Sequence, residues 1–191
     1  MENFKVREVW QNGEKAADDS LAEKFLTAAG GRLQRLGQGS FPLEVNGVQV
    51  EFLHPPLGRK EASIFWGNDA SLVLRLTFGE VSFLFCGDVE AAAEGEIRRA
   101  FPGLQSTVIK VPHHGSKTSS IPEFVESVRP KYAVFTVKAG GRHRLPHPIV
   151  LKRYEDLGVK AFLSDRDGAI TFTTKGKDFQ VRTFLGDKKA F

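Results

Sequence analysis

Runs of apolar residues broken by turn signals mark the first half of this chain as rich in hairpins. Asn46–Gly47 lies between two such runs and favours the positive φ angles of a tight hairpin turn. Gly79–Glu80 lies between two more, and these are nearly all apolar, so we expect strands buried on both faces. The predicted hairpin strands are Phe41–Val45, Val48–Leu53, Ser71–Phe78 and Val81–Phe85.

From Val81 onward, predicted strands alternate with predicted helices, in the order β, α, β, α, β, α, β, β. This alternation indicates an α/β sheet with crossover helices. Upstream, Asp19 or Ser20 can cap a helix whose Leu21 and Phe25 share one face, and Gly30–Gly31 would end it. The further strands are predicted at Val6–Trp10, Arg32–Leu36, Thr107–Val111, Tyr132–Val137, Val159–Leu163, Ala169–Thr174 and Phe179–Phe184, with helices at Glu90–Phe101, from Ile121 or Pro122, and at Pro148–Leu157.

Composition limits the class of protein more than it identifies a partner. At 191 residues with 41% apolar content, the chain is long enough for one domain with a sizeable core. The net charge of +4 permits a phosphate-bearing partner but does not require one. The one cysteine, Cys86, excludes an intramolecular disulfide and ends an apolar run, so we expect a buried thiol. No apolar run approaches the roughly 18 residues of a membrane span, and the N-terminus does not resemble a signal peptide.

Candidate chemistry gathers in the stretch Val81–Ser120. Asp88 follows the end of one predicted strand, and His113 and His114 follow the end of the next. In an open α/β sheet, reactive groups collect at the carboxyl ends of the strands, so we expect these side chains to share one edge. A carboxylate together with imidazoles suits Zn, Mn or Fe better than Mg or Ca.

Two motifs in this stretch and a third further along the chain carry a resemblance. CGD-VE, then VPHHGSKTSS, then DRDGAI resemble, in order and spacing, the C-terminal metallo-β-lactamase-like domain of the ComEC family of competence DNA-uptake proteins. The resemblance covers roughly Val6 to Phe184. It implies an α/β fold of the αββα sandwich type, mainly the C-terminal half of that fold. We therefore expect one partial domain over residues 1–185 and a disordered tail over 186–191. The family's upstream motif, His-x-Asp-x-Asp-His, has no counterpart, because no histidine precedes His54.

The resemblance also implies metal ligands and catalytic residues. Asp88 would bridge two divalent ions, Zn or Mn, and His113 or His114 would bind metal or stabilise charge; which of the two faces the site stays open. The resembled family usually shows a His-Pro or Phe-Pro pair at the position of Leu145–Pro146, often followed by a second His-Pro, and a leucine in the first position cannot bind metal. His147 is the candidate substitute, against a structural role. With part of the ligand set missing, we expect weak metal binding by this chain alone.

A phosphate site is predicted beside the histidines. Ser116, Lys117 and Ser119 precede a helix whose N-terminal N–H groups suit an anion. Helix capping explains a hydroxyl equally well, but it does not explain the lysine. Lys117 is also a candidate catalytic cation. Arg142 and Arg144 are candidate contacts to a phosphate backbone, or else part of a solvated basic loop.

Taken together, the resemblance implies a soluble domain of a bacterial inner-membrane protein that hydrolyses the phosphodiesters of DNA. The expected partners are single-stranded DNA and the transmembrane channel portion of the parent protein. Two other hypotheses stay open. One is a non-catalytic module that binds DNA or partner subunits, and the other is a metallo-β-lactamase-like hydrolase acting on another phosphodiester or ester.

Overall fold

The computed structural model describes residues 5–13, 18, 20–57, 65–141 and 144–186. Its α-helices are α1 (Leu21–Ala29), α3 (Ala91–Ala100), α4 (Pro122–Val128), α5 (Pro148–Asp156) and α6 (Ser164–Asp167). Its strands are β1 (Val9–Gln11), β2 (Leu33–Arg35), β3 (Leu43–Val45), β4 (Val48–His54), β5 (Val73–Phe78), β6 (Val81–Phe85), β7 (Val108–Lys110), β8 (Tyr132–Phe135), β9 (Lys160–Leu163), β10 (Ile170–Thr174) and β11 (Phe179–Thr183).

A seven-stranded sheet forms the centre of the molecule, in the order β3-β4-β5-β6-β7-β8-β9. Strands β3 to β6 pair antiparallel, and β6 to β9 pair parallel. Both predicted hairpins are present, since Val45 pairs with Val48 and Phe78 with Val81. The mixed sheet therefore follows directly from the sequence pattern: hairpins first, then strand–helix crossovers. The α/β class predicted from the sequence is confirmed.

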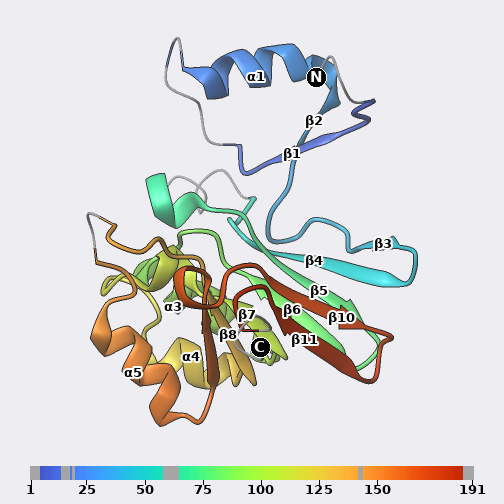
Figure 1. Cartoon of the computed structure of the whole chain (residues 1–191). Coiled ribbons are helices and arrows are strands. Elements are labelled where there is room, and N and C mark those ends of the chain that lie inside the picture. Colours follow the sequence, from blue (N-terminus) through green and yellow to red (C-terminus); the bar gives the residue numbers. More distant parts are fainter. Residues whose placement is uncertain (1–4, 14–17, 19, 58–64, 142–143, 187–191) are drawn as a thin grey trace.

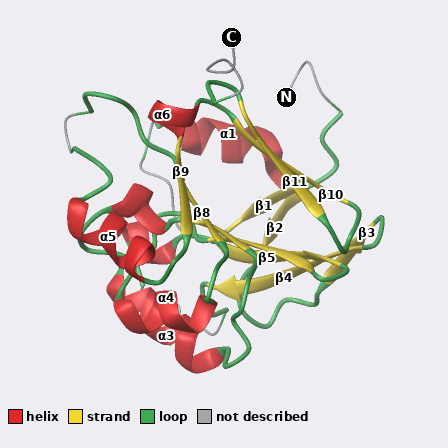
Figure 2. Ribbon diagram, turned by 60° about the horizontal axis from the view of Figure 1, so that its bottom comes forward, coloured by secondary structure: helices red, strands yellow, loops and turns green. Residues whose placement is uncertain are grey.

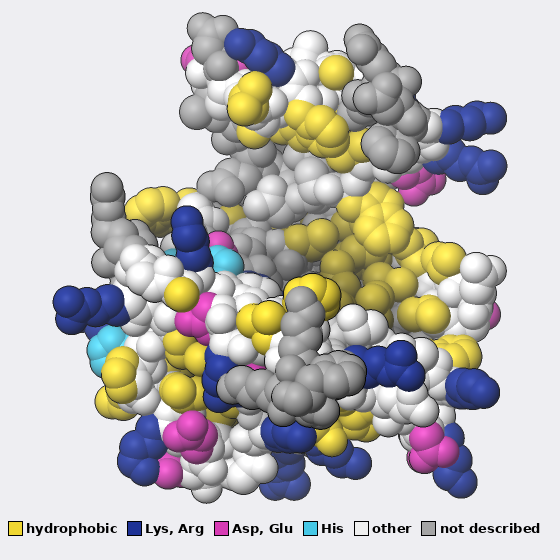
Figure 3. All heavy atoms as spheres, viewed as in Figure 1, with side chains coloured by type: hydrophobic (Ala, Val, Ile, Leu, Met, Phe, Trp, Pro, Cys, Tyr) yellow, Lys and Arg dark blue, Asp and Glu magenta, His cyan; other side chains and the backbone are white. Residues whose placement is uncertain are grey.

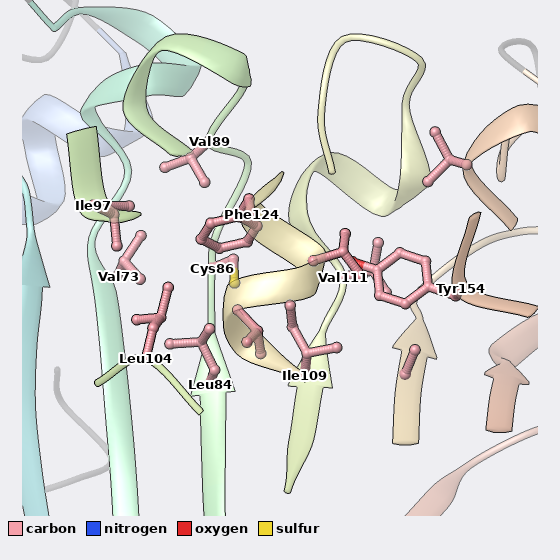
Figure 4. Packing of buried hydrophobic residues seen from close by; sticks show 14 of the residues in the cluster. Val73, Leu84, Cys86, Val89, Ile97, Leu104, Ile109, Val111, Phe124 and Tyr154 are labelled. Carbon is pink, nitrogen blue, oxygen red and sulfur yellow. The ribbon is translucent and has the colours of Figure 1, made fainter. Parts of the chain in front are cut away.

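The three crossover helices α3, α4 and α5 lie on one face of this sheet (Figures 1 and 2). Side chains from β5, β6 and β7 meet those of α3 and α4 there and form the main core (Figure 4). Cys86 is fully buried in this layer, as its apolar context predicted. Burial raises the pKa of its thiol well above the ordinary range, so Cys86 is a packing residue. The largest buried side chains of the core include Tyr154, Phe124, Phe135, Leu84, Ile97 and Ile109.

The β10–β11 hairpin covers part of the opposite face of the sheet (Figure 2). It forms a sheet of its own and is held to the main sheet by aromatic rings rather than by a strand ladder. Phe172 of β10 packs against Phe83 of β6 and Tyr132 of β8, with ring centroids 5.8 and 6.0 Å apart. The hairpin thus extends the core onto a second face.

The N-terminal elements α1, β1 and β2 lie together at one end of the molecule (Figure 1). Strands β1 and β2 pair parallel, a pairing that the sequence pattern did not predict. Ser20 caps α1 by accepting from the N–H of Glu23, as expected. The apolar face of α1 is exposed, with 85% of Leu21 accessible. Hydrophobic side chains gather in the hollow between these elements and the main body (Figure 3).

Two further predictions concern the C-terminal tail and membrane-spanning helices. The disordered tail was predicted at residues 186–191. Of these, residues 187–191 lie outside the part of the chain that the structure describes. Among the described residues, every helix is too short or too polar to cross a lipid bilayer.

Candidate functional site

The turns that follow β6 and β7 lie side by side at one edge of the main sheet. These strands are parallel neighbours, with Phe85 opposite Lys110 in the register. The backbone N–H of His113 donates to the carbonyl of Gly87 over 3.2 Å. The placement of the acidic and histidine turns at one rim, expected from the sequence, is therefore confirmed. They open onto a pocket of about 620 Å³, lined by Asp88, His113, His114, Ser116, Lys117, Leu145 and His147.

Asp88 is held at this rim by its backbone. Gly87 has a φ of +56°, and a Cβ atom there would lie 2.6 Å from the Cβ of Ser71, so only glycine fits without strain. The N–H of Asp88 donates to the Ser71 hydroxyl over 3.1 Å. One carboxylate oxygen, Oδ1, then lies 3.5 Å from Nε2 of His114 and 3.6 Å from Nζ of Lys110.

His114 directs its second ring nitrogen, Nε2, at the carboxylate of Asp88. Its Nδ1 lies 2.7 Å from the backbone carbonyl of Thr136. A carbonyl only accepts, so the proton of the neutral ring belongs on Nδ1, and the lone pair of Nε2 faces the carboxylate of Asp88. A backbone carbonyl that fixes the tautomer in this way is typical of histidines that bind metal.

His113 faces a different carboxylate. Its Nδ1 lies 2.9 Å from Oε1 of Glu90, although the angle is outside ordinary hydrogen-bond geometry. The same oxygen accepts from the hydroxyl of Thr118 over 2.9 Å. Both histidines have positive φ, 44° and 56°, which turns the two rings away from each other. His114 therefore faces Asp88, and His113 faces Glu90.

Lys110 and Glu90 are site residues that the sequence analysis missed. Lys110 donates to the Gly87 carbonyl over 3.0 Å, so its cation braces the turn that carries Asp88. Its signal in the sequence is a single charge inside the apolar strand VIKV. Glu90 is fixed by Asp69, whose Oδ1 accepts from the Glu90 N–H over 2.7 Å. Asp69 and Ser71 of the segment Asn68–Ser71 thus support the turns that carry both carboxylates.

Only some of the residues predicted to bind phosphate line the pocket. Ser116 and Lys117 line the pocket. Ser119 does not, which corrects the prediction: its side chain is 1% exposed, and its hydroxyl bonds to the carbonyls of Pro112 and Ser116. Arg142 lies outside the described residues. Arg144 is exposed beside a neighbouring hollow rather than in this pocket.

We expected a phosphate at the N-terminus of α4. In the structure a carboxylate of the protein occupies that position. The carboxylate of Glu94 on α3 accepts from the N–H of Ser120 over 2.5 Å and from that of Ile121 over 2.8 Å. Glu94 is fully buried. Burial raises its pKa to about 7, against the opposing effect of those two hydrogen bonds.

His147 lines the pocket but acts as a helix cap. Its Nδ1 accepts from the N–H of Ile149 over 3.3 Å at the start of α5. That acceptor role uses the unprotonated nitrogen of the neutral ring, so the structural alternative fits this geometry better than metal binding. In the DRDG segment, where the sequence suggests a turn, the structure has the short helix α6, and Asp167 at its end accepts from the N–H of Leu163.

The donor set fits only part of a metal site. Asp88 and His114 offer an oxygen and a nitrogen 3.5 Å apart at the pocket. Within the described residues, His, Cys, Asp and Glu nowhere form a group of three or more that could hold a metal ion. Catalytic zinc sites usually have three protein ligands, so these two residues form an incomplete shell.

Comparisons with known proteins identify relatives among competence proteins. Over 158 residues, 81% of this chain, the sequence is 30% identical to ComE operon protein 3 of Bacillus subtilis, of which it covers 20%. Over 152 residues, 76% of the chain, it is 32% identical to competence protein ComA of Neisseria gonorrhoeae, of which it covers 21%. The chain belongs to the ComEC family.

This ComEC-family chain spans about a fifth of the length of those curated relatives. Recombination protein 2 of Haemophilus influenzae is 34% identical over 86 residues, which are 45% of this chain and 11% of that protein. No protein-family model matches the sequence. A solved structure from the metallo-β-lactamase superfamily, from Thermotoga maritima, is 17% identical with a TM-score of 0.40, covering 63% of this chain and 58% of that one. That structural likeness is partial.

Proposed function

We propose that this chain forms the phosphate-binding half of a metal-dependent nuclease domain in a ComEC-like DNA-uptake protein. The observation that carries the proposal is the pocket itself, where Asp88 and His114 face each other beside Ser116 and Lys117. The proposed substrate is single-stranded DNA, and the proposed partner is the membrane-spanning portion of a longer parent protein. Kinship with competence proteins supports both.

Asp88 and His114 are the residues of this chain that would hold a divalent ion, Zn or Mn. When bound, such an ion lowers the pKa of a water to about 7 and polarises the phosphate. The other residues of the pocket have binding and positioning roles. Lys117 and Ser116 bind the phosphate, and Lys110 keeps Asp88 in place. His113, beside the carboxylate of Glu90, is positioned to carry a proton.

The incomplete shell predicts weak metal binding that depends on Asp88. Titration calorimetry with Mn²⁺ and Zn²⁺ should show low affinity for the wild-type protein, and Asp88→Asn should weaken it by at least about tenfold, since it replaces the anionic oxygen of one of the two donors by a neutral amide. Asp156→Asn is the matched control, because Asp156 is an exposed carboxylate paired with Lys152 on α5. Cleavage of labelled single-stranded DNA should be slow.

Two outcomes would contradict this proposal. Equal metal affinities for Asp88→Asn and Asp156→Asn would remove Asp88 from the metal site. Rapid turnover by the isolated chain, lost in Asp88→Asn, would show that the site is complete without further ligands.

A non-catalytic binding module is the second candidate, and the two-donor site with Leu145 in its wall favours it. The two functions differ in their response to chelation. DNA binding that is sensitive to salt but unaffected by EDTA and by Asp88→Asn would support the binding module.

A further inference from the structure

A second, smaller hollow adjoins the pocket on the far side of His114. Its volume is about 200 Å³, and its lining residues are His114, Thr136, Val137, Lys138, Gly141, Arg144 and Leu145. His114 and Leu145 line both cavities, so these two side chains form the wall between them. A ligand that extends beyond the pocket in this direction meets the second hollow next.

The described charged residues of this second hollow are both cations. Of the described residues that line it, Lys138 and Arg144 are charged and none is acidic. Both are exposed, and within the described part of the chain neither has a hydrogen bond or ion pair from its side chain. Lys110, by contrast, is engaged by the Gly87 carbonyl and Asp88. Two unpaired cations beside one small hollow suit an anion.

The order of side chains across the two cavities is a cation, the wall formed by Leu145 and His114, and two more cations. Lys117 lies in the first, Leu145 lies between, and Lys138 and Arg144 lie in the second. The backbone of a nucleic acid alternates in the same way, because an uncharged sugar separates each pair of phosphates. A flexible single strand can bend around such a wall more readily than a duplex can.

We propose that the second hollow is a binding subsite for the phosphate next to the one in the pocket, along one single strand of nucleic acid. Lys138 and Arg144 bind this flanking phosphate, and Leu145 contacts the sugar between the two. The inference rests on the proposed function, since it takes the substrate of the pocket to be a nucleic acid strand.

The test is the salt dependence of binding. A labelled oligothymidylate of about 12 nucleotides is titrated with the full chain, followed by fluorescence anisotropy. Between about 50 and 200 mM salt, the logarithm of the affinity falls with a slope of about 0.7 per phosphate contact on single strands. The double variant Lys138→Gln, Arg144→Gln should therefore lower that slope by about 0.7, because the two cations share one phosphate.

The matched control is Lys175→Gln with Lys177→Gln, which removes the same charge from the exposed tip of the β10–β11 hairpin. It should leave the slope unchanged. Leu145→Ala should weaken binding without changing the slope, because it removes apolar contact and no charge. Circular dichroism melts verify that each variant is folded.

The outcomes separate the two proposals. If the wild-type chain does not bind the strand at any salt concentration, the proposed function fails. If it binds, but the Lys138/Arg144 variant has the slope of the control variant, the subsite is wrong and the proposed function survives. Unchanged affinity in Leu145→Ala would remove the sugar contact.

Discussion

At the residue scale, Glu94 shows how burial changes what a common side chain does. In the sequence it is one of several glutamates on a helix rich in alanine, a type usually solvated. In the structure it is fully buried and binds two backbone N–H groups at the end of the histidine loop. Arg153 of α5 donates to the carbonyl of Ser120, and the hydroxyl of Tyr154 bonds to that of Ser120. Side chains from α3 and α5 therefore both hold the end of this loop.

The raised pKa of Glu94 predicts that the free energy of unfolding falls as pH rises. The ordinary pKa of 4.5 applies in the unfolded chain, and burial raises the folded value to about 7. Between these values the folded protein holds a proton that the unfolded chain has released, so rising pH favours unfolding. The loss should approach about 3 kcal/mol by pH 8, at about 1.4 kcal/mol per pKa unit.

Urea unfolding of the wild type and Glu94→Gln at pH 4.5 and pH 8 measures this effect. Glutamine does not titrate, so the wild type should lose more stability than the variant over this range. Glu155→Gln, on exposed surface, serves as the control. Parallel curves for the wild type and Glu94→Gln would show that Glu94 titrates normally.

At the element scale, two strand-to-loop turns build the site, and each depends on a glycine. Gly87 ends the β6 turn with φ of +56°, and Gly115 ends the histidine turn with φ of +81°. A Cβ atom on Gly115 would lie 2.8 Å from the Cβ of Pro146 and 2.9 Å from the ring of Phe135. Substitution at either glycine therefore meets both a strained backbone and a close neighbour.

Gly87→Ala should destabilise the protein by about 1 to 3 kcal/mol, because the backbone strain adds to the clash with Ser71. Gly103→Ala is the matched control, since Gly103 has open space around its Cα and no positive φ. Thermal melting compares the two. Equal melting temperatures would mean that the β6 turn adapts to a side chain at no cost.

At the scale of the whole molecule, one sheet is covered in two different ways. Helices α3 to α5 bury one face, and the β10–β11 hairpin covers part of the other through aromatic packing. Phe172 is central to that packing, since its ring lies within 6.3 Å of those of Phe83, Tyr132, Phe162 and Phe179. The hairpin has no ladder to the main sheet, so these rings hold it together with one backbone hydrogen bond, from the N–H of Glu80 to the carbonyl of Gly176.

Phe172→Ala should destabilise the fold by about 2 to 4 kcal/mol, since it removes a large apolar side chain from a multi-ring cluster. Phe41→Ala is the control, because Phe41 is 90% exposed. Denaturant unfolding gives both values. A loss no larger than that of the control would mean that the hairpin is held by something other than its aromatic rings.

The sequence by itself determined the strand–helix order and much of the site's position. Local signals suffice for these features: Asn46–Gly47 sets a tight turn, and a strand that ends in Gly87–Asp88 or before His113 places polar groups at a sheet edge. The motifs around Asp88 and His114 also identified the ComEC family, which the relatives confirmed.

Tertiary structure alone decided which side chains meet. Glu94 reaches Ser120 across 26 residues, and Lys110 reaches Gly87 across 23, so no local pattern reveals either contact. Packing likewise buried Ser119, although its neighbours Ser116 and Lys117 remain at the pocket. Residues adjacent in sequence point in different directions, and only the folded chain selects which of them face the site.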